Sequence, residues 1–152
     1  MSKVKNYFLS ILREVAASTR KVIVVYPGRF QPFHAGHAGV YLKVKQDFPQ
    51  AKVYVITADN ISKSGDIKDQ AKNPLSFAAK STIIKHMFSI TPVKVANPYN
   101  KDSVAQALHI KDQENTILIF AIGGKDMEEG NERFAYKKKD GSIDIAHLTA
   151  AL

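Results

Sequence analysis

The chain has 152 residues, 45% of them hydrophobic, and a formal net charge of +8 at pH 7. This length suits one domain, and the apolar fraction is enough for a core. The absence of cysteine excludes disulfides and thiolate chemistry, and no apolar run reaches the roughly 18 residues of a membrane-spanning helix.

The first predicted element is an amphipathic helix over residues 3–18. It can pack on its own domain, dock to a partner or a second copy of the chain, or, more weakly, bind a membrane surface. Its apolar stripe consists of Val4, Tyr7, Phe8, Ile11, Leu12 and Val15.

A strand–turn–helix–strand unit comes next. An apolar strand is predicted over residues 21–26, a helix over 36–47 and a second strand over 52–57. This order favours a parallel sheet and therefore an α/β fold. The turn has the sequence Gly28-Arg29-Phe30-Gln31-Pro32-Phe33-His34-Ala35-Gly36-His37.

This turn has the parts of a phosphate site. The N–H groups and partial positive charge of a helix N-terminus attract phosphate, and Gly28 and Gly36 permit close approach. His34 and His37 can face one phosphate group and stabilise charge on a transferred nucleotidyl group and on leaving pyrophosphate. Arg29 can add a fixed positive charge. Taken alone, two histidines three residues apart more often belong to a plain tight turn.

A polar segment over residues 59–73 predicts a loop at the carboxyl edge of the sheet, either a lid over a nucleotide or a plain surface loop. Asn73 as N-cap and Pro74 at the first helical position predict a helix that runs to Phe88. Its side chains expected to pack on the sheet are Ile83, Ile84, Met87 and Phe88.

The remainder of the chain predicts two strands, over residues 92–95 and 116–122, and a helix over 103–111. The turn at residues 97–100 can contact a second substrate, although turn formation alone explains its composition. Asp140-Gly141 predicts a hairpin with arms at 134–138 and 142–145.

The turn from Gly28 to His37 resembles the motif of the HxGH nucleotidylyltransferase superfamily, and most closely the GRFQPxHxGH of the nicotinamide-nucleotide adenylyltransferase group. The resemblance implies a Rossmann-like three-layer domain with a parallel sheet. Because members of this superfamily usually begin close to their first strand, it also implies that residues 1–20 form an N-terminal helical extension ahead of a main domain over residues 21–152. It implies transfer of an adenylyl or cytidylyl group from ATP or CTP to a phosphorylated acceptor such as nicotinamide mononucleotide, with release of pyrophosphate. It also assigns the catalytic roles to His34 and His37.

The same resemblance implies a nucleotide site. Asn73 to Phe77 with Lys80 is similar to the family's second segment, and Gly123 to Asp126 is similar to an element near the base and ribose. Magnesium is expected to be held by the triphosphate and water, with no metal site on the protein. The implied nucleotide-binding residues are Gly28, Arg29, Phe30, Gln31, Gly36, Lys80, Gly123, Gly124 and Asp126.

One family feature is missing. The signature ISxTxxR, a phosphate-binding turn near the C-terminus of the superfamily, does not occur, so the resemblance covers about residues 21–140. We therefore expect a domain incomplete at its C-terminus: a fragment, a chain completed by a partner, or a domain that kept the fold without catalysis. This third alternative is an assembly module, such as a bacteriophage virion component.

The expected partners are a nucleoside triphosphate and a phosphorylated small molecule, within a homo-oligomer or a larger assembly. Nucleic acid is not favoured, because most lysines are scattered and only residues 137–139 form a run. The expected location is the cytoplasm, or the virion for the assembly module. A nucleotide sensor without turnover is a third, weaker functional hypothesis.

Overall fold

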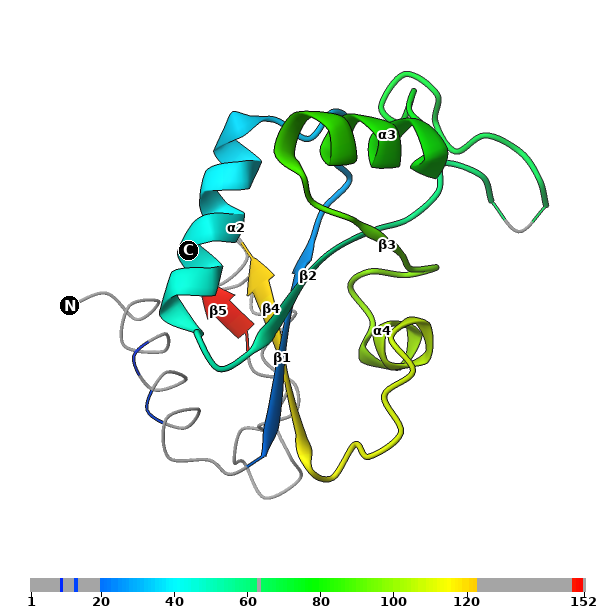
Figure 1. The fold of residues 1–152 in the computed structure, drawn as a ribbon. Coiled ribbons are helices and arrows are strands. Elements are labelled where there is room, and N and C mark those ends of the chain that lie inside the picture. Colours follow the sequence, from blue (N-terminus) through cyan, green and yellow to red (C-terminus); the bar gives the residue numbers. More distant parts are fainter. Residues whose placement is uncertain (1–8, 10–12, 14–19, 63, 123–148, 152) are drawn as a thin grey trace.

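The computed structural model describes residues 9, 13, 20–62, 64–122 and 149–151. Within these residues, parallel strands form one sheet in the order β3-β2-β1-β4-β5 (Figure 1). The strands are β1 (Lys21–Pro27), β2 (Lys52–Thr57), β3 (Val93–Lys94), β4 (Thr116–Ile122) and β5 (Thr149–Ala151). The parallel sheet confirms the α/β prediction.

The centre of the sheet is formed by β1, which pairs with β2 on one side and β4 on the other. Ile23 lies opposite Lys52 and Leu118 in these two pairings. Every residue of β4 is buried, and so are all residues of β1 after Lys21. Strands that are covered on both faces need such continuous apolar runs, which explains why their sequences do not alternate with polar residues.

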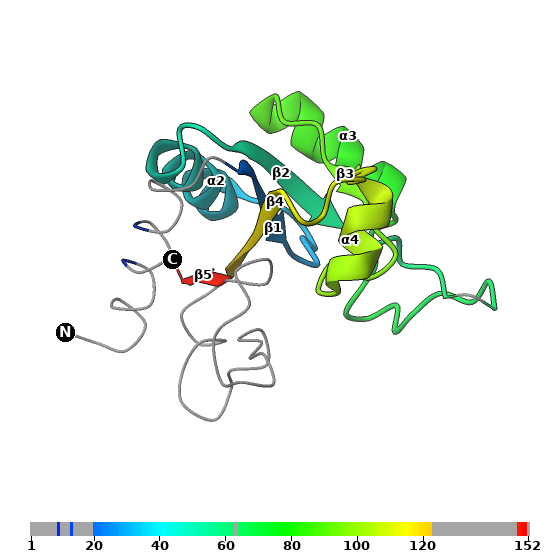
Figure 2. The ribbon, with the colours of Figure 1, turned by 90° about the horizontal axis from the view of Figure 1, so that it is seen from below.

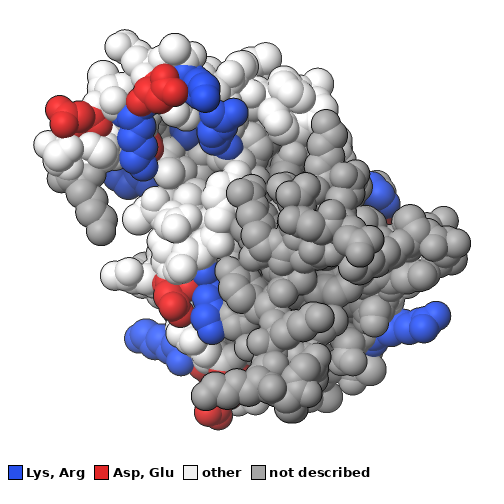
Figure 3. All heavy atoms as spheres, turned by 180° about the vertical axis from the view of Figure 1, so that it is seen from behind, with Lys and Arg blue, Asp and Glu red and all other residues white. Residues whose placement is uncertain are grey.

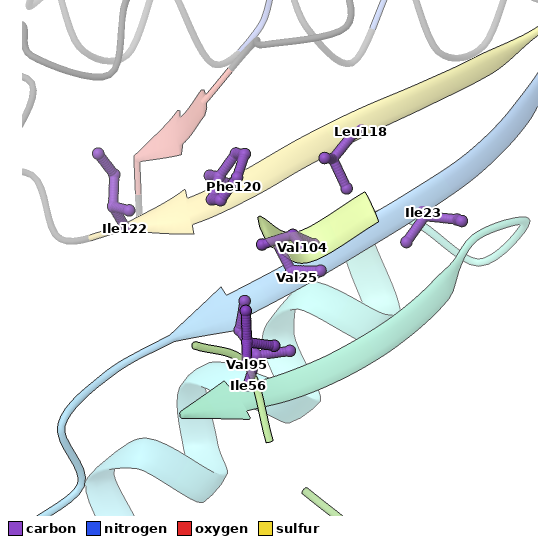
Figure 4. Close-up of a cluster of buried hydrophobic side chains, with 8 residues drawn as sticks. All are labelled: Ile23, Val25, Ile56, Val95, Val104, Leu118, Phe120 and Ile122. Carbon is purple, nitrogen blue, oxygen red and sulfur yellow. The ribbon is translucent and has the colours of Figure 1, made fainter. Parts of the chain in front are cut away.

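Helices cover both faces of the sheet and complete the predicted Rossmann-like three-layer arrangement (Figures 1 and 2). They are α2 (Ala35–Asp47), α3 (Phe77–Phe88) and α4 (Lys101–Ala107). On one face, Val24 of β1 packs with Val44 of α2, and Tyr26 packs with Ile84 of α3. On the other face, Val25 packs with Val104 of α4 (Figure 4).

The predicted start of the third helix is wrong. The helix begins at Phe77, and its N-cap is Ser76, whose hydroxyl accepts a hydrogen bond from the backbone N–H of Ala79 at 3.2 Å. Leu75 stays outside the helix because the side-chain amide of Gln31 bonds to both its backbone groups, at 2.8 and 2.9 Å. This contact joins residues 44 positions apart, so the local sequence gives no sign of it.

Two further details differ from the prediction. Met87 is 69% exposed, because the buried stripe of α3 runs through Lys80 and Ile84, one helical turn apart. Asn100 caps α4, which therefore starts two residues earlier than predicted and ends at Ala107. The predicted helix over 3–18 falls almost wholly outside the described residues, and the 134–145 hairpin falls wholly outside them.

Candidate active site

The turn between β1 and α2, residues 28–37, is called the histidine loop below. It lies at the carboxyl edge of the sheet, where β1 separates β2 from β4. The chain builds outward through β2 and β3 and then crosses to the other side of β1 to form β4. Open α/β sheets bind ligands outside the carboxyl ends of the strands at such a reversal of strand order.

The two histidines form a reciprocal cap at the start of α2. Nδ1 of His34, the N-cap residue, accepts a hydrogen bond from the backbone N–H of Gly36 at 3.1 Å. The backbone N–H of His34 in turn donates to Nδ1 of His37 at 3.0 Å. The two rings are stacked, with centroids 3.8 Å apart. Because each Nδ1 acts as an acceptor, each neutral ring carries its hydrogen on Nε2.

The surroundings of His37 favour the neutral form of its ring. His37 is half-buried against the aromatic rings of Tyr26, Phe30 and Phe33, with centroid distances of 6.4, 5.0 and 5.2 Å. This burial lowers the pKa of His37 below its usual 6.5, and the neighbouring His34 lowers it further. The lowered pKa of His37 favours an uncharged N–H donor on this ring beside the positive end of the α2 dipole.

Phe30 gives the histidine loop its shape. It has a left-handed backbone with φ of 48°, and its side chain is buried under the loop. Its ring lies so close to Gly28 that a Cβ there would be 2.5 Å from it, which explains the glycine. The backbone oxygen of Gly28 accepts a hydrogen bond from the Thr57 hydroxyl at 2.7 Å, so the end of β2 holds the loop.

Lys80 lies behind the histidine loop and is only 3% exposed. Its Nζ donates to the Arg29 carbonyl at 3.0 Å, to Thr57 Oγ1 at 2.7 Å and to the Ala58 carbonyl at 2.6 Å. These acceptors match the three hydrogens of an ammonium group. Burial lowers the pKa of Lys80 to about 8, although the nearby carboxylate of Asp59 raises it.

The structure brings only part of the predicted nucleotide site together. The Phe30 side chain is buried, and the Gln31 side chain bonds to the Leu75 backbone. Gly36 lies in the first turn of α2, and the Arg29 side chain is exposed. The roles of these residues and of Lys80 in nucleotide binding stay predictions. Gly123, Gly124 and Asp126 lie outside the described residues.

A cavity of about 470 Å³ lies at the carboxyl ends of β2 and β3. Half of its lining comes from the segment predicted as a lid or a surface loop, residues 59–73, and the other half, Ala58 and residues 94–96, was not predicted to line a site. Its lining includes Lys68 and Lys94 as cations and Asp59 as an anion. A hydrogen bond from the Phe77 N–H lowers the pKa of Asp59, and a bond from Asn60 N–H with the charges of Lys94 and Lys80 lowers it further, against the effect of burial. The full lining is Ala58, Asp59, Ile61, Ser62, Lys68, Lys94, Val95 and Ala96.

The segment over residues 59–73, called the pocket loop below, contributes much of this lining. The surface of the pocket loop carries both positive and negative side chains. Lys72 lies 4.0 Å from Asp69, and Figure 3 shows blue and red side chains next to each other at its upper left. In the part of the chain that the structure describes, no three metal-ligating side chains of the His, Cys, Asp and Glu types cluster. Nor is any helix there both long and apolar enough to cross a membrane.

Comparison with known sequences decides the family. Residues 25–142 match the family model described as cytidylyltransferase-like. The chain belongs to the cytidylyltransferase-like family. The match contains the histidine loop, both strands that flank β1 and the cavity, so the recognised resemblance to the HxGH nucleotidylyltransferase superfamily is confirmed.

Two named relatives extend this cytidylyltransferase-like assignment. The tRNA(Met) cytidine acetate ligase of Mesomycoplasma hyopneumoniae is 25% identical over 126 residues, which cover 74% of this chain and 40% of the relative. The phosphopantetheine adenylyltransferase of Mycoplasma capricolum is 46% identical over 44 residues, or 29% of this chain and 30% of the relative. These matches span less than half of either relative. They support an enzyme of the nucleotidyltransferase type in general.

Proposed function

We propose that the chain transfers a nucleotidyl group from a nucleoside triphosphate to a phosphorylated acceptor and releases pyrophosphate. The observation that carries this proposal is the reciprocal cap of His34 and His37, which leaves both Nε2–H groups as donors at the N-terminus of α2. Phosphate is the ligand that such an N-terminus attracts. Membership of the cytidylyltransferase-like family supports the same reaction class.

The reaction needs no proton from the protein. A phosphate oxygen of the acceptor attacks the α-phosphorus, a new P–O bond forms, and the bond from the α-phosphorus to the oxygen that bridges to the β-phosphate breaks. Pyrophosphate leaves with that oxygen and its electron pair. The two Nε2–H groups stabilise the charge that develops on the phosphoryl oxygens, and the remaining rate enhancement comes from positioning. Magnesium enters as part of the substrate, bound to the triphosphate.

The cavity beside the pocket loop is our candidate for the acceptor site. It lies at the same edge of the sheet as the histidine loop, because β2 is the direct neighbour of β1. Lys68 and Lys94 are suited to an anionic acceptor, and the ionised Asp59 is suited to accept a hydrogen bond from a hydroxyl. An acceptor with both a phosphate and free hydroxyls, such as nicotinamide mononucleotide, meets these requirements.

The test is pyrophosphate release with ATP or CTP, magnesium and a panel of acceptors. The panel contains nicotinamide mononucleotide, phosphopantetheine and acetate, the last two suggested by the names of the relatives. The matched control is His34→Ser, which keeps an N-cap side chain but removes Nε2. We expect release that depends on one phosphorylated acceptor and on His34.

Two results would contradict the proposal. Release that is equally fast in His34→Ser would remove the histidine from the mechanism. No release with any pair of substrates, from protein that forms a stable oligomer by light scattering, would favour the assembly module. ATP binding without turnover would instead favour a nucleotide sensor.

A further inference from the structure

Lys80 connects the two parts of the proposed active site. Its ammonium group bonds to the carbonyl of Arg29 in the histidine loop and to the carbonyl of Ala58 in the wall of the cavity. Between these two contacts it bonds to the hydroxyl of Thr57, which itself donates to the Gly28 carbonyl. A single side chain on α3 therefore ties the nucleotide half of the site to the acceptor half.

A contribution to stability explains poorly why a lysine occupies this buried position of α3. Burial disfavours the charged form of an amine, and this burial is what lowers the pKa of Lys80 to about 8. Even a complete buried ion pair can often be replaced by apolar side chains without loss of stability, so a buried charge is weak evidence of a role in stability. The neighbouring position in the same stripe, Ile84, is fully buried and apolar. A charge at Lys80 is thus better explained by the groups that it holds in place.

We propose that Lys80 is a positioning residue that sets the histidine loop relative to the acceptor cavity. The kinetic part of this inference rests on the proposed function. In-line attack needs the reacting atoms about 3–3.5 Å apart, and a misplacement of about 1 Å can cost roughly 10²-fold in rate. Lys80 therefore acts through the backbone of Arg29 and the hydroxyl of Thr57, with its hydrogens directed at protein oxygens.

The variants separate this role from a direct contact with phosphate. Lys80→Met removes the ammonium and keeps an unbranched apolar stem. Thr57→Val removes the hydroxyl without a change of shape, and Thr57→Ser restores the hydroxyl. Lys85→Met, at an exposed lysine of the same helix, is the matched control for the loss of one positive charge.

The kinetic measurement compares kcat with KM for both substrates. We expect Lys80→Met to lower kcat by roughly 10²-fold and each KM to change by less than about threefold. Thr57→Val is expected to lower kcat in the same direction, and Thr57→Ser and Lys85→Met to stay near the parent. Because Lys80 and Thr57 act as a unit, the double variant should lose little more than Lys80→Met alone.

The second measurement does not require turnover. The pKa of His37, measured by NMR titration of the free protein, reports whether its ring stays buried against Phe30 and Phe33. If Lys80 holds the loop, both Lys80→Met and Thr57→Val should raise this pKa towards 6.5, and Thr57→Ser and Lys85→Met should not. Among the residues that the structure describes, the titratable side chains whose rings contact His37 are His34 and Tyr26, and all variants retain both.

An unchanged pKa of His37 in folded Lys80→Met and Thr57→Val would overturn the positioning role. A higher KM for the triphosphate in Lys80→Met, with Thr57→Val like the parent, would overturn it in favour of a direct phosphate contact. If Lys80→Met does not fold, Thr57→Val decides the question. If the parent shows no turnover at all, the proposed function fails, and the His37 titration still tests the positioning role.

Discussion

The two loops at the carboxyl edge of the sheet are held in different ways. The histidine loop is fixed by bonds to distant parts of the sequence: the Gln31 side chain of the loop bonds to the Leu75 backbone across 44 positions, and the Lys80 side chain bonds to the Arg29 carbonyl across 51. The bonds of the pocket loop are mostly internal, such as Ser62 N–H to the Asp66 carbonyl at 2.8 Å. The conformation of the histidine loop therefore depends on distant parts of the fold, whereas the conformation of the pocket loop depends mainly on bonds within the loop.

This difference suggests a division of labour. Electrostatic stabilisation of a transition state requires donors that are fixed before the reaction. In the histidine loop the local cap orients the two histidine rings, and long-range bonds hold the backbone that carries them. Acceptor specificity tolerates local rearrangement. The pocket loop exposes Ile61, which lines the cavity, and its bridge partner Ile67, at 47% and 52%. Changes in the first loop should therefore affect turnover, and changes in the second should affect mainly the KM of the acceptor.

The largest effect is expected at the histidines. His37→Ala and His34→Ser should each lower kcat by about 10²–10³-fold, the usual consequence of the loss of a preorganised donor. His34→Ala should lower kcat equally but also lose about 1 kcal/mol of stability with the N-cap. Steady-state kinetics and urea unfolding of the three variants test this. Equal stability of His34→Ala and His34→Ser would contradict the capping role.

A smaller effect is expected for Gly28→Ala, which tests how rigidly the histidine loop is held. The new Cβ would lie 2.5 Å from the Phe30 ring, so this buried ring must move. We expect a loss of about 1–3 kcal/mol, the usual cost of overpacking a core, together with reduced turnover. Urea unfolding measures the first and pyrophosphate release the second. Parent-like stability and parent-like turnover would show that the histidine loop adapts and is not rigidly held.

Acidification should destabilise the protein through His37. Its pKa in the folded state is lowered below the usual 6.5, so between these two pKa values the unfolded chain binds more protons than the folded one. Stability must therefore fall as the pH falls through that window. Urea unfolding as a function of pH should show a shallower decline below pH 6.5 in His37→Gln than in the parent. An equal decline of stability in His37→Gln and in the parent would contradict the lowered pKa of His37.

The smallest effect is expected in the pocket loop. Ser64 bonds only to neighbours within the loop, to Ser62 at 2.8 Å and to Asp66 at 3.0 Å, among the contacts that the structure describes. Ser64→Ala should change stability by less than about 1 kcal/mol, because the hydroxyl is exposed to water, and it should leave kcat unchanged. Kinetics with a fixed triphosphate and varied acceptor provide the test. A loss of kcat as large as in Gly28→Ala would remove the distinction between the loops.

The fold was more predictable from sequence than the support of the site. The predicted bounds of β2 and β4 agree with the structure, because a buried parallel strand is a continuous apolar run between polar residues. The predicted start of α3 is wrong because it depends on a contact with a distant part of the chain. The Gln31 side chain bonds to the backbone of Leu75, directly before the N-cap Ser76, and no local pattern records a partner 44 residues away.

The same limit applies to the candidate site. The histidine motif is local, so its position at the start of α2 followed from the sequence. The burial of Lys80 did not, because a lysine in an amphipathic helix ordinarily lies on the solvent side. Its burial depends on three oxygens supplied by Arg29, Thr57 and Ala58, which only the folded sheet brings together.

The most direct test of the central claim follows the α-phosphate. The chain is incubated with magnesium, an acceptor from the panel and a triphosphate labelled at its α-phosphate, in parallel with His34→Ser. Our account predicts that the label appears in the acceptor, with one pyrophosphate released for each label transferred, and that His34→Ser slows both by about 10²–10³-fold. Release of inorganic phosphate without transfer of the label, or transfer that does not depend on His34, would contradict it.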